Sequence, residues 1–252
     1  MAQMRLDKLL AQAAELPRSK ARREILAGRV TVDGVVCRQP DQKVESDAAL
    51  GLAGRPLCWQ QQIYLMVDKP AGLLSASRDA SCRTVVDLVR DQYPRRALFP
   101  AGRLDKDSTG FVLLTDDGPL AHALLSPKHH VEKVYRVTLD CPATEEMRRG
   151  FARGVPLADG QRMLPAGLEI DSEDPAGVTV TLHQGVYHQI KRMFGVYGAG
   201  VVTLRRVAIG GVALDPTLGP GGSRPLTTAE LARLRGVLGE LGEPADFARQ
   251  DG

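Results

Sequence analysis

The chain has 252 residues, 43% of them hydrophobic and 25% charged, and its formal net charge is +3 at pH 7. These values are ordinary for a soluble globular protein, and so mild a charge does not by itself indicate a nucleic-acid partner. No run of about 18 apolar residues could span a membrane, and the first residues lack the apolar core of a signal peptide. The cysteines are widely separated without CxxC spacing, which argues against a disulfide framework or a zinc site and fits a reducing cytoplasm: Cys37, Cys58, Cys82 and Cys141.

Two helices and a hairpin are predicted in residues 1–45. Apolar residues recur at helical spacing in the first helix: Leu6, Leu9, Leu10 and Ala13. Ser19 is placed to cap a second helix, and Gly28 is placed to end it. Residues 30–36 alternate around Asp33-Gly34, a pair typical of a tight hairpin turn. The segment therefore predicts a compact module.

Basic side chains gather on the second of these helices. Residues 1–43 hold nine Lys and Arg residues against five Asp and Glu residues. Basic groups on one folded face attract phosphate, and the candidates are Arg18, Lys20, Arg22 and Arg23. A solvated helix face is the more frequent reason for such a cluster, and the charge pattern leaves both interpretations open.

A linker and a larger domain follow this module. Residues 46–62 are polar and irregular, with one short strand at most, and we expect the single tryptophan, Trp59, to pack there. The larger domain is predicted over residues 63–235. A mobile tail is predicted over residues 236–252.

The larger domain is predicted to combine short strands with short helices. Strands are predicted over residues 63–67, 111–115, 133–139, 178–182, 201–207 and 212–214. Helices are predicted over residues 84–89, 119–125, 143–154 and 187–197, and a last one begins near Thr227 or Thr228. Strands outnumber helices, and few strand–helix–strand units recur. We therefore predict an α+β fold with a mixed, mainly antiparallel sheet flanked by helices.

A polar loop bounded by glycines carries Asp105 into the strand at residues 111–115. Such a strand fixes the loop before it, and rigidly mounted loops often hold catalytic groups. Asp105 is therefore a candidate catalytic carboxylate. Most loop aspartates only cap a turn, however, and spacing alone favours that simpler interpretation.

The residues around Asp105 resemble the catalytic motif of pseudouridine synthases of the RsuA family. Within that family they are most similar to the branch that modifies small-subunit ribosomal RNA. The match runs through Gly102-Arg103-Leu104-Asp105, Thr109-Gly110, Leu113-Leu114-Thr115 and Asp117-Gly118. The resemblance implies isomerisation of a uridine to pseudouridine in ribosomal RNA, most simply 16S rRNA, with Asp105 as the catalytic residue. Whether Asp105 acts as nucleophile or base stays open. No metal and no other cofactor are implied.

Two further motifs resemble those of the same family. Residues 185–194 match Gly-x-Tyr-His-Gln-Val-Lys-Arg-Met, which implies that Lys191 pairs with Asp105 and keeps it charged. Lys133-x-Tyr135-x-Val137 matches Lys-x-Tyr-x-Val, whose tyrosine stacks on the target base. Without the resemblance, Lys191 would be a solvated lysine and Tyr135 a core residue. Further RNA contacts are expected from Arg103, which would help to flip the nucleotide, and from His188 and Arg192.

The N-terminal module resembles the S4 RNA-binding domain, which implies that its basic helix lies against RNA phosphates without reading bases. The chain also departs from the family at Gln184 and Val186, where glutamate and arginine are usual, and at Asp68, where asparagine is usual. The loss of an arginine at Val186 puts one RNA contact in doubt.

Two alternative functions remain open at this point. One is the same reaction on 23S rRNA, although Ser126-Pro-Lys-His-His130 resembles the small-subunit branch. The other is a non-catalytic RNA-binding or ribosome-assembly factor that keeps the fold. A small-molecule substrate is disfavoured because it would leave an RNA-binding module unexplained. We expect a monomer.

Overall fold

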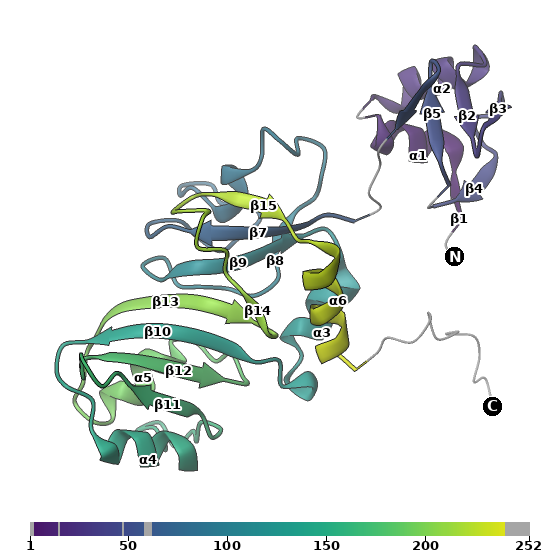
Figure 1. Ribbon diagram of the computed structural model, residues 1–252. Coiled ribbons are helices and arrows are strands. Elements are labelled where there is room, and N and C mark those ends of the chain that lie inside the picture. Colours follow the sequence, from purple (N-terminus) through teal and green to yellow (C-terminus); the bar gives the residue numbers. More distant parts are fainter. Residues whose placement is uncertain (1–2, 15, 47, 58–61, 240–252) are drawn as a thin grey trace. The chain divides into compact units, whose positions relative to one another are not determined.

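The structure is a computed structural model that describes residues 3–14, 16–46, 48–57 and 62–239 (Figure 1). The chain divides into two compact units. The first comprises residues 1–63 together with 93–96, and the second comprises residues 64–92 and 97–252. Each unit has its own hydrophobic core.

The N-terminal unit combines two helices with two small antiparallel sheets. Its helices are α1 (Leu6–Ala13) and α2 (Arg18–Leu26). β1 (Gln3–Arg5) pairs with β4 (Lys43–Glu45). The other sheet has the order β3-β2-β5-β6, with β2 (Val30–Val32), β3 (Val35–Cys37), β5 (Leu50–Leu52) and β6 (Arg55–Leu57). The helical spacing noted in the sequence buries Leu6, Leu9 and Leu10 against Ile25 and Val30.

The N-terminal sheet extends beyond residue 45, where we predicted the module to end. β5 pairs with β2, and β6 pairs with β5, so residues 50–57 belong to this sheet and are not a linker. The prediction failed because three-residue strands with Gly51 and Pro56 lack a visible period. Trp59 lies outside the described residues.

The second unit is built on a nine-stranded mixed sheet, which confirms the predicted α+β class (Figure 1). The main order is β11-β12-β10-β13-β9-β7-β15, with β14 beside β13 and β8 beside β9. Among the pairs of strands in this sheet, only β9 with β13 is parallel within the described residues. The strands are β7 (Tyr64–Lys69), β8 (Phe99–Pro100), β9 (Thr109–Thr115), β10 (Lys133–Leu139), β11 (Gly167–Ile170), β12 (Gly177–Leu182), β13 (Val201–Ile209), β14 (Val212–Ala213) and β15 (Ser223–Pro225).

Helices cover this sheet and complete its core. The helical segments are η1 (Val85–Leu88), α3 (Gly118–Leu125), η2 (Pro127–His129), α4 (Glu145–Arg153), α5 (Gln189–Gly195) and α6 (Thr228–Val237). α3 and α6 share one core with β7 and β9, including Met66, Phe111, Leu120 and Leu234. On another part of the unit, Phe151 of α4 packs on Phe194 of α5 with ring centroids 4.7 Å apart. None of the helices in the described ranges is long and apolar enough to cross a membrane.

Two sequence predictions differ from the structure at helix ends. The helix predicted from residue 187 begins at Gln189, because His188 has a left-handed backbone with φ of 50°. Tyr187 and His188 therefore precede the helix. The predicted mobile tail begins inside α6, which ends at Val237, and residues 240–252 lie outside the described residues.

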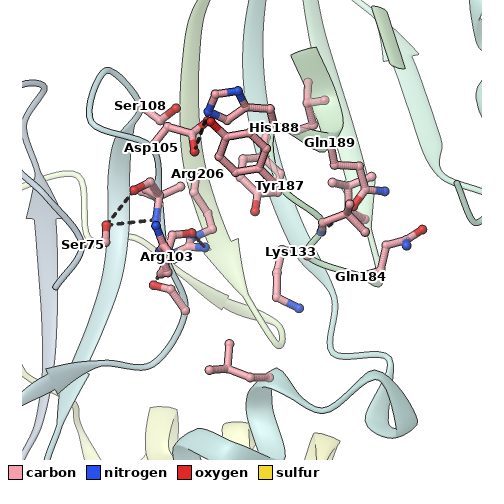
Figure 2. Close-up of a pocket in the computed structure, with 18 of the residues that line it drawn as sticks. Ser75, Arg103, Asp105, Ser108, Lys133, Gln184, Tyr187, His188, Gln189 and Arg206 are labelled. Carbon is pink, nitrogen blue, oxygen red and sulfur yellow. Dashed lines mark hydrogen bonds and ion pairs between the residues drawn. The ribbon is translucent and has the colours of Figure 1, made fainter. Parts of the chain in front are cut away.

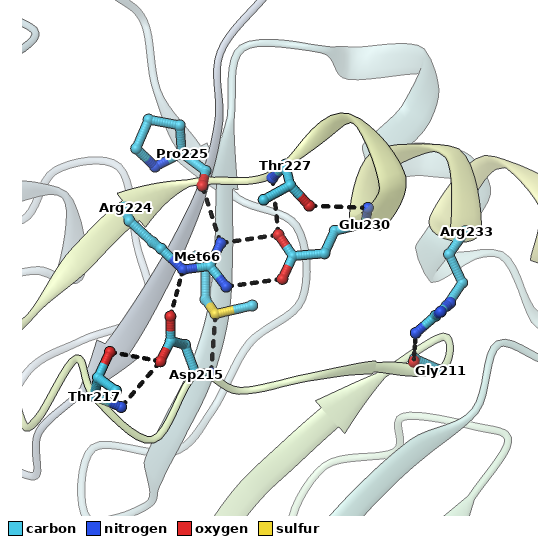
Figure 3. A network of polar contacts seen from close by, with 9 residues as sticks. All are labelled: Met66, Gly211, Asp215, Thr217, Arg224, Pro225, Thr227, Glu230 and Arg233. Atoms are coloured by element: carbon cyan, nitrogen blue, oxygen red, sulfur yellow. Dashed lines mark hydrogen bonds and ion pairs between the residues drawn. The ribbon is translucent and has the colours of Figure 1, made fainter.

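A polar network fixes α6 to the edge of the sheet (Figure 3). Arg224 of β15 donates to Asp215 at 2.7 Å and to both carboxylate oxygens of Glu230 at 2.8 Å. Glu230 also completes a capping box with Thr227 at the start of α6. Hydrogen bonds from Thr217 and Arg224 lower the pKa of Asp215 to about 2, and the bonds from Arg224 lower that of Glu230 to about 2.

Replacing Arg224 with methionine should lower the melting temperature by about 2–6 °C at pH 7, because it breaks both ion pairs. The carboxylates are stabilised in their charged form, so this contribution is complete above about pH 4.5 and is lost as the pH falls towards 2. The difference in melting temperature between wild type and variant should therefore shrink between pH 5 and pH 2.5.

Arg233→Met is the matched control, since Arg233 lies on the same helix and makes one hydrogen bond, to the carbonyl of Gly211. It should shift the melting temperature by less than half as much. A difference for Arg224→Met that does not change with pH would contradict the assignment of the network.

Candidate active site

A cavity of about 750 Å³ lies in the second unit (Figure 2). Its wall is formed by the loop before β9, the start of β10, the segment after β12 and the first turn of α5. Six of the residues singled out by the sequence line it: Arg103, Asp105, Tyr135, His188, Lys191 and Lys133. The cavity therefore brings together three motifs that are far apart in the chain.

The loop carrying Asp105 is held by a serine that bonds its backbone. The Ser75 hydroxyl donates to the carbonyl of Leu104 at 2.8 Å and accepts from the amide of the same residue at 3.0 Å. Both residues are buried. One side chain thus satisfies two backbone groups next to Asp105 that would be costly to leave unpaired.

Two buried cations complete the support of this loop. Lys69, at the end of β7, lies within hydrogen-bond distance of four carbonyls, at 2.7–3.3 Å: those of Pro70, Asp105, Lys106 and Ser108. Arg206 of β13 donates to the carbonyl of Phe111 at 2.7 Å and to those of Gly102 and Arg103 at 3.4 Å. Burial lowers the pKa of Lys69 to about 8. Asp105 is therefore mounted on a backbone that three buried side chains fix.

Gly110 allows the strand after the loop to come close to Arg206. Its φ is +98°, and a Cβ there would collide with the backbone carbonyl oxygen of Arg206 on β13. Gly110 pairs with Arg206 in the parallel ladder between β9 and β13. The glycine of the Thr109-Gly110 pair is thus required by this close approach.

Two cationic or titratable groups face the Asp105 carboxylate. His188 Nε2 lies 3.4 Å from Oδ1 of Asp105, and Lys191 Nζ lies 3.9 Å from Oδ2. The shorter contact of Lys191 is with Asp107, at 2.6 Å. This hydrogen bond lowers the pKa of Asp107. Lys191 therefore lies between two carboxylates, and Asp107 is a partner that the sequence reasoning missed.

The left-handed backbone at His188 aims its ring at Asp105 and stacks it on Tyr187. The two ring centroids are 3.8 Å apart, and Tyr187 is 71% exposed beside the cavity. Tyr135, by contrast, is buried in the cavity wall on β10. The site thus offers two tyrosines, one exposed and one buried.

Two other expected RNA contacts have different surroundings. Arg103 is exposed and lines the cavity, which suits a residue that reaches a nucleotide. Arg192 is ion-paired with Asp159 and is not among the residues that line the cavity. Gln184, which replaces the usual glutamate, accepts a hydrogen bond from the amide of Leu164 at 2.6 Å.

In the N-terminal unit, a buried carboxylate organises part of the basic cluster. Asp7 is fully buried on α1, and it accepts hydrogen bonds from Arg5 at 3.2 Å, Arg18 at 2.9 Å and Arg22 at 3.1 Å. Burial alone would raise the pKa of Asp7, but the bonds from Arg5 and Arg18 hold it well below its usual range. Arg18 and Arg22 are about half exposed. They therefore keep donors free for an outside anion.

Lys20 and Arg23 of the same helix are exposed and are also available to phosphate. Arg29, just beyond the helix, is instead paired with Glu24 at 2.6 Å. Within the described ranges, no group of three or more His, Cys, Asp or Glu side chains is arranged to hold a metal ion.

Sequence reasoning missed the residues that support the loop. Lys69 follows Asp68, which the sequence marks only as a departure from the usual asparagine. Asp68 forms a bidentate ion pair with Arg205 at 2.8 and 2.9 Å. The available signal for Arg206 was two consecutive arginines inside a strand. A charged residue in a buried strand indicates a specific partner.

Comparisons with known proteins agree with these two units. Residues 63–195 match the model of the family described as RNA pseudouridylate synthase, and residues 4–50 match the S4 domain. The chain is 43% identical over 231 residues to ribosomal small subunit pseudouridine synthase A of Escherichia coli strain K12, covering 91% of this chain and 99% of that protein.

Two further likenesses extend over the same length. The chain is 43% identical to an uncharacterized RNA pseudouridine synthase of Bacillus subtilis, covering 90% of this chain and 97% of that protein. A crystal structure of a pseudouridylate synthase superposes with a TM-score of 0.65 at 38% identity, covering 92% of this chain and 99% of that one.

Replacing Ser75 with alanine should loosen the Asp105 loop, because it leaves the buried amide and carbonyl of Leu104 without a partner. We expect a loss of about 1–3 kcal/mol in the free energy of unfolding. Hydrogen–deuterium exchange should speed up in peptides covering residues 101–108 and stay unchanged in the N-terminal unit.

Ser77→Ala is the control, because Ser77 is an exposed serine two residues away. It should leave both the stability and the exchange unchanged. Equal exchange in the two variants would show that Ser75 does not support the loop.

Proposed function

Because the chain belongs to the RNA pseudouridylate synthase family and carries an S4 domain, we propose that it isomerises a specific uridine of 16S ribosomal RNA to pseudouridine. The observation that carries this proposal is the position of Asp105, on a rigidly held loop in a cavity and beside His188 and Lys191. The extended similarity to a small-subunit enzyme supports 16S rRNA as the substrate.

The reaction breaks the N1–C1′ bond of uridine and joins C1′ to C5 of the same base. It needs a carboxylate at the sugar, a pocket for a flipped base and exclusion of water. Asp105 supplies the carboxylate, either as nucleophile at C1′ or as base at C2′. A cavity of about 750 Å³ lies within the range that accepts small ligands and has room for one nucleotide.

We assign the other site residues by their surroundings. Lys191 and His188 hold Asp105 in place, and the ammonium of Lys191 offsets its negative charge. Tyr135 provides the face on which the flipped base stacks, because its ring is buried in the cavity wall. Arg103 is exposed at the cavity and can fill the position that the base leaves in the RNA.

The N-terminal unit supplies affinity for the RNA backbone. Arg18, Lys20, Arg22 and Arg23 are exposed along α2, and Asp7 fixes the directions of two of them. We propose that they contact phosphates, and that Arg192 has at most a minor part because it is paired with Asp159. We further propose that the chain acts as a monomer and that its rRNA substrate places it in the cytoplasm.

Asp105→Asn is the test of the catalytic assignment. The substitution is nearly isosteric, so the melting temperature and the RNA affinity should change little. An amide is neither a competent nucleophile nor a base, and pseudouridine formation should fall below detection. Single-turnover assays on 16S rRNA and 23S rRNA, read by carbodiimide primer extension, measure both the yield and the site.

Three further variants are compared with Asp105→Asn in the same activity assay. Asp171→Asn, an exposed turn aspartate outside the cavity lining, is the control and should keep wild-type activity. Lys191→Met should slow turnover by about 10²–10³-fold, and Tyr135→Phe should be mildest because stacking needs only the ring. A wild-type yield of pseudouridine from Asp105→Asn would refute the catalytic role of Asp105. Product found only in 23S rRNA would show that this RNA, and not 16S rRNA, is the substrate. No product from the wild-type protein would favour a non-catalytic binding factor.

A separate variant tests the basic helix. Lys20→Gln combined with Arg23→Gln should weaken RNA binding and reduce the slope of log affinity against log salt by about 0.7–0.9 for each phosphate that the variant no longer neutralises. Arg29→Gln is the matched control, since Arg29 is already paired with Glu24. An unchanged slope in the double variant would show that this face is only solvated.

A further inference from the structure

Lys133 is a buried cation without an acidic partner in the cavity wall. It is 8% exposed at the start of β10, and its side chain points into the cavity (Figure 2). Its Nζ makes one hydrogen bond, to the carbonyl of Val131 at 2.7 Å. No carboxylate of the described residues forms an ion pair with it. Two of the three N–H donors of this ammonium are therefore free to meet a ligand.

The other buried cations of this region differ from Lys133 in this respect. Lys69 bonds backbone carbonyls of the Asp105 loop, and Arg206 does the same. Those two support the fold, whereas Lys133 uses one donor on the carbonyl two residues before it. A buried charge with so few bonds costs stability, which points to a role in function.

Lys133 keeps its charge at neutral pH. Burial lowers its pKa to about 8, and the nearby positive charge of Arg206 acts in the same direction. At pH 7 about nine-tenths of the molecules therefore carry the ammonium form. The wall of the cavity holds a positive charge that nothing in the described chain neutralises.

The position of Lys133 relates it to the flipped base. Lys133 and Tyr135 are two residues apart on β10, so their side chains leave the same face about 7 Å apart. In the proposed function, Tyr135 stacks on the uracil. The ammonium then lies beside the edge of the stacked uracil, while Asp105 comes from the loop on the other side of the cavity (Figure 2).

We propose that the Lys133 ammonium donates a hydrogen bond to a uracil carbonyl oxygen and stabilises the uracil anion that forms when the glycosidic bond breaks. This inference rests on the proposed function. The electron pair of the N1–C1′ bond leaves with the base, which carries the negative charge over N1, O2 and O4. Meanwhile C1′ is held by Asp105 as an ester, or as a C1′=C2′ double bond after Asp105 has taken the C2′ proton. C5 of the turned base then bonds to C1′ as the ester bond breaks or as the proton returns to C2′, after which the C5 proton is lost and N1 gains a proton. Lys133 keeps its own proton throughout.

The surroundings favour a base oxygen over a phosphate as the partner of this ammonium. Apolar side chains of Leu125, Pro127 and Leu182 line the cavity together with Lys133. Bringing a permanently charged phosphate into such a wall would cost far more than bringing a neutral carbonyl. The negative charge on the base develops only as the glycosidic bond breaks. A cation placed to meet it therefore lowers the barrier of the reaction and does not merely tighten substrate binding.

The test compares Lys133→Met with wild type on two RNAs, one with uridine and one with 5-fluorouridine at the target. The fluorine withdraws electrons and stabilises the departing anion without help from the protein. Loss of the starting nucleoside under single-turnover conditions reports bond cleavage in both. We expect Lys133→Met to slow the uridine reaction about 10²–10³-fold and the 5-fluorouridine reaction at least about tenfold less. RNA affinity should stay within about twofold.

Stability gives a second readout. Methionine fills a similar volume without a charge, so Lys133→Met should keep or raise the melting temperature. Lys133→Gln keeps a neutral donor in case the apolar variant misfolds, and it should show a smaller defect of the same kind. Arg148→Met removes an exposed cation of α4 that lies outside the cavity lining, so it is the control and should match wild type on both RNAs.

Several outcomes would overturn the proposal. Equal defects on the two RNAs would show that Lys133 does not act on the leaving base. Weaker binding with a salt slope reduced by about 0.7–0.9 would make it a phosphate contact. If the wild-type protein is active, either of these two results overturns the role of Lys133 and leaves the proposed function standing. A wild type that modifies neither RNA overturns the proposed function, and this inference with it.

Discussion

Buried cations bonded to backbone carbonyls hold the loop that carries Asp105. Lys69 and Arg206 come from β7 and β13, which lie on either side of β9, and both reach the carbonyls around residues 102–108. Each carbonyl oxygen carries only a partial negative charge, so several carbonyls are needed to stabilise one buried cation. The loop is shaped by this need, and the Asp105 carboxylate becomes part of a rigidly supported wall.

In the N-terminal unit a buried charge also organises its surroundings, but here the buried charge is negative. There the buried group is the Asp7 carboxylate, and the arginines around it remain partly in water. In the second unit Lys69 and Arg206 direct their donors inward to backbone carbonyls. Asp7, by contrast, leaves donors of Arg18 and Arg22 directed outward. One arrangement builds a stiff support, and the other presents a prearranged cationic surface.

Much of the site could be predicted from the sequence, because the motifs around Asp105, Tyr135 and Lys191 are long and matched by position. The cavity contains all three. What could not be predicted depends on the backbone path. Asp107 takes the short contact with Lys191, and His188 reaches Asp105 because its φ is positive. Neither fact has a periodic signal. Likewise, β5 and β6 escaped detection because they are three-residue strands without an amphipathic pattern, which join the sheet by pairing β5 with β2 and β6 with β5.

The consecutive arginines Arg205 and Arg206 also fix the register of β13 against the neighbouring strand. Successive side chains of a strand leave opposite faces, so Arg205 reaches Asp68 on β7 while Arg206 reaches the carbonyls beside the Asp105 loop. A slip of one residue would exchange these faces and leave both the buried Asp68 carboxylate and the loop carbonyls without partners. A slipped register of the parallel pair β9–β13 would therefore be less stable than the observed one, with no substrate needed to distinguish them.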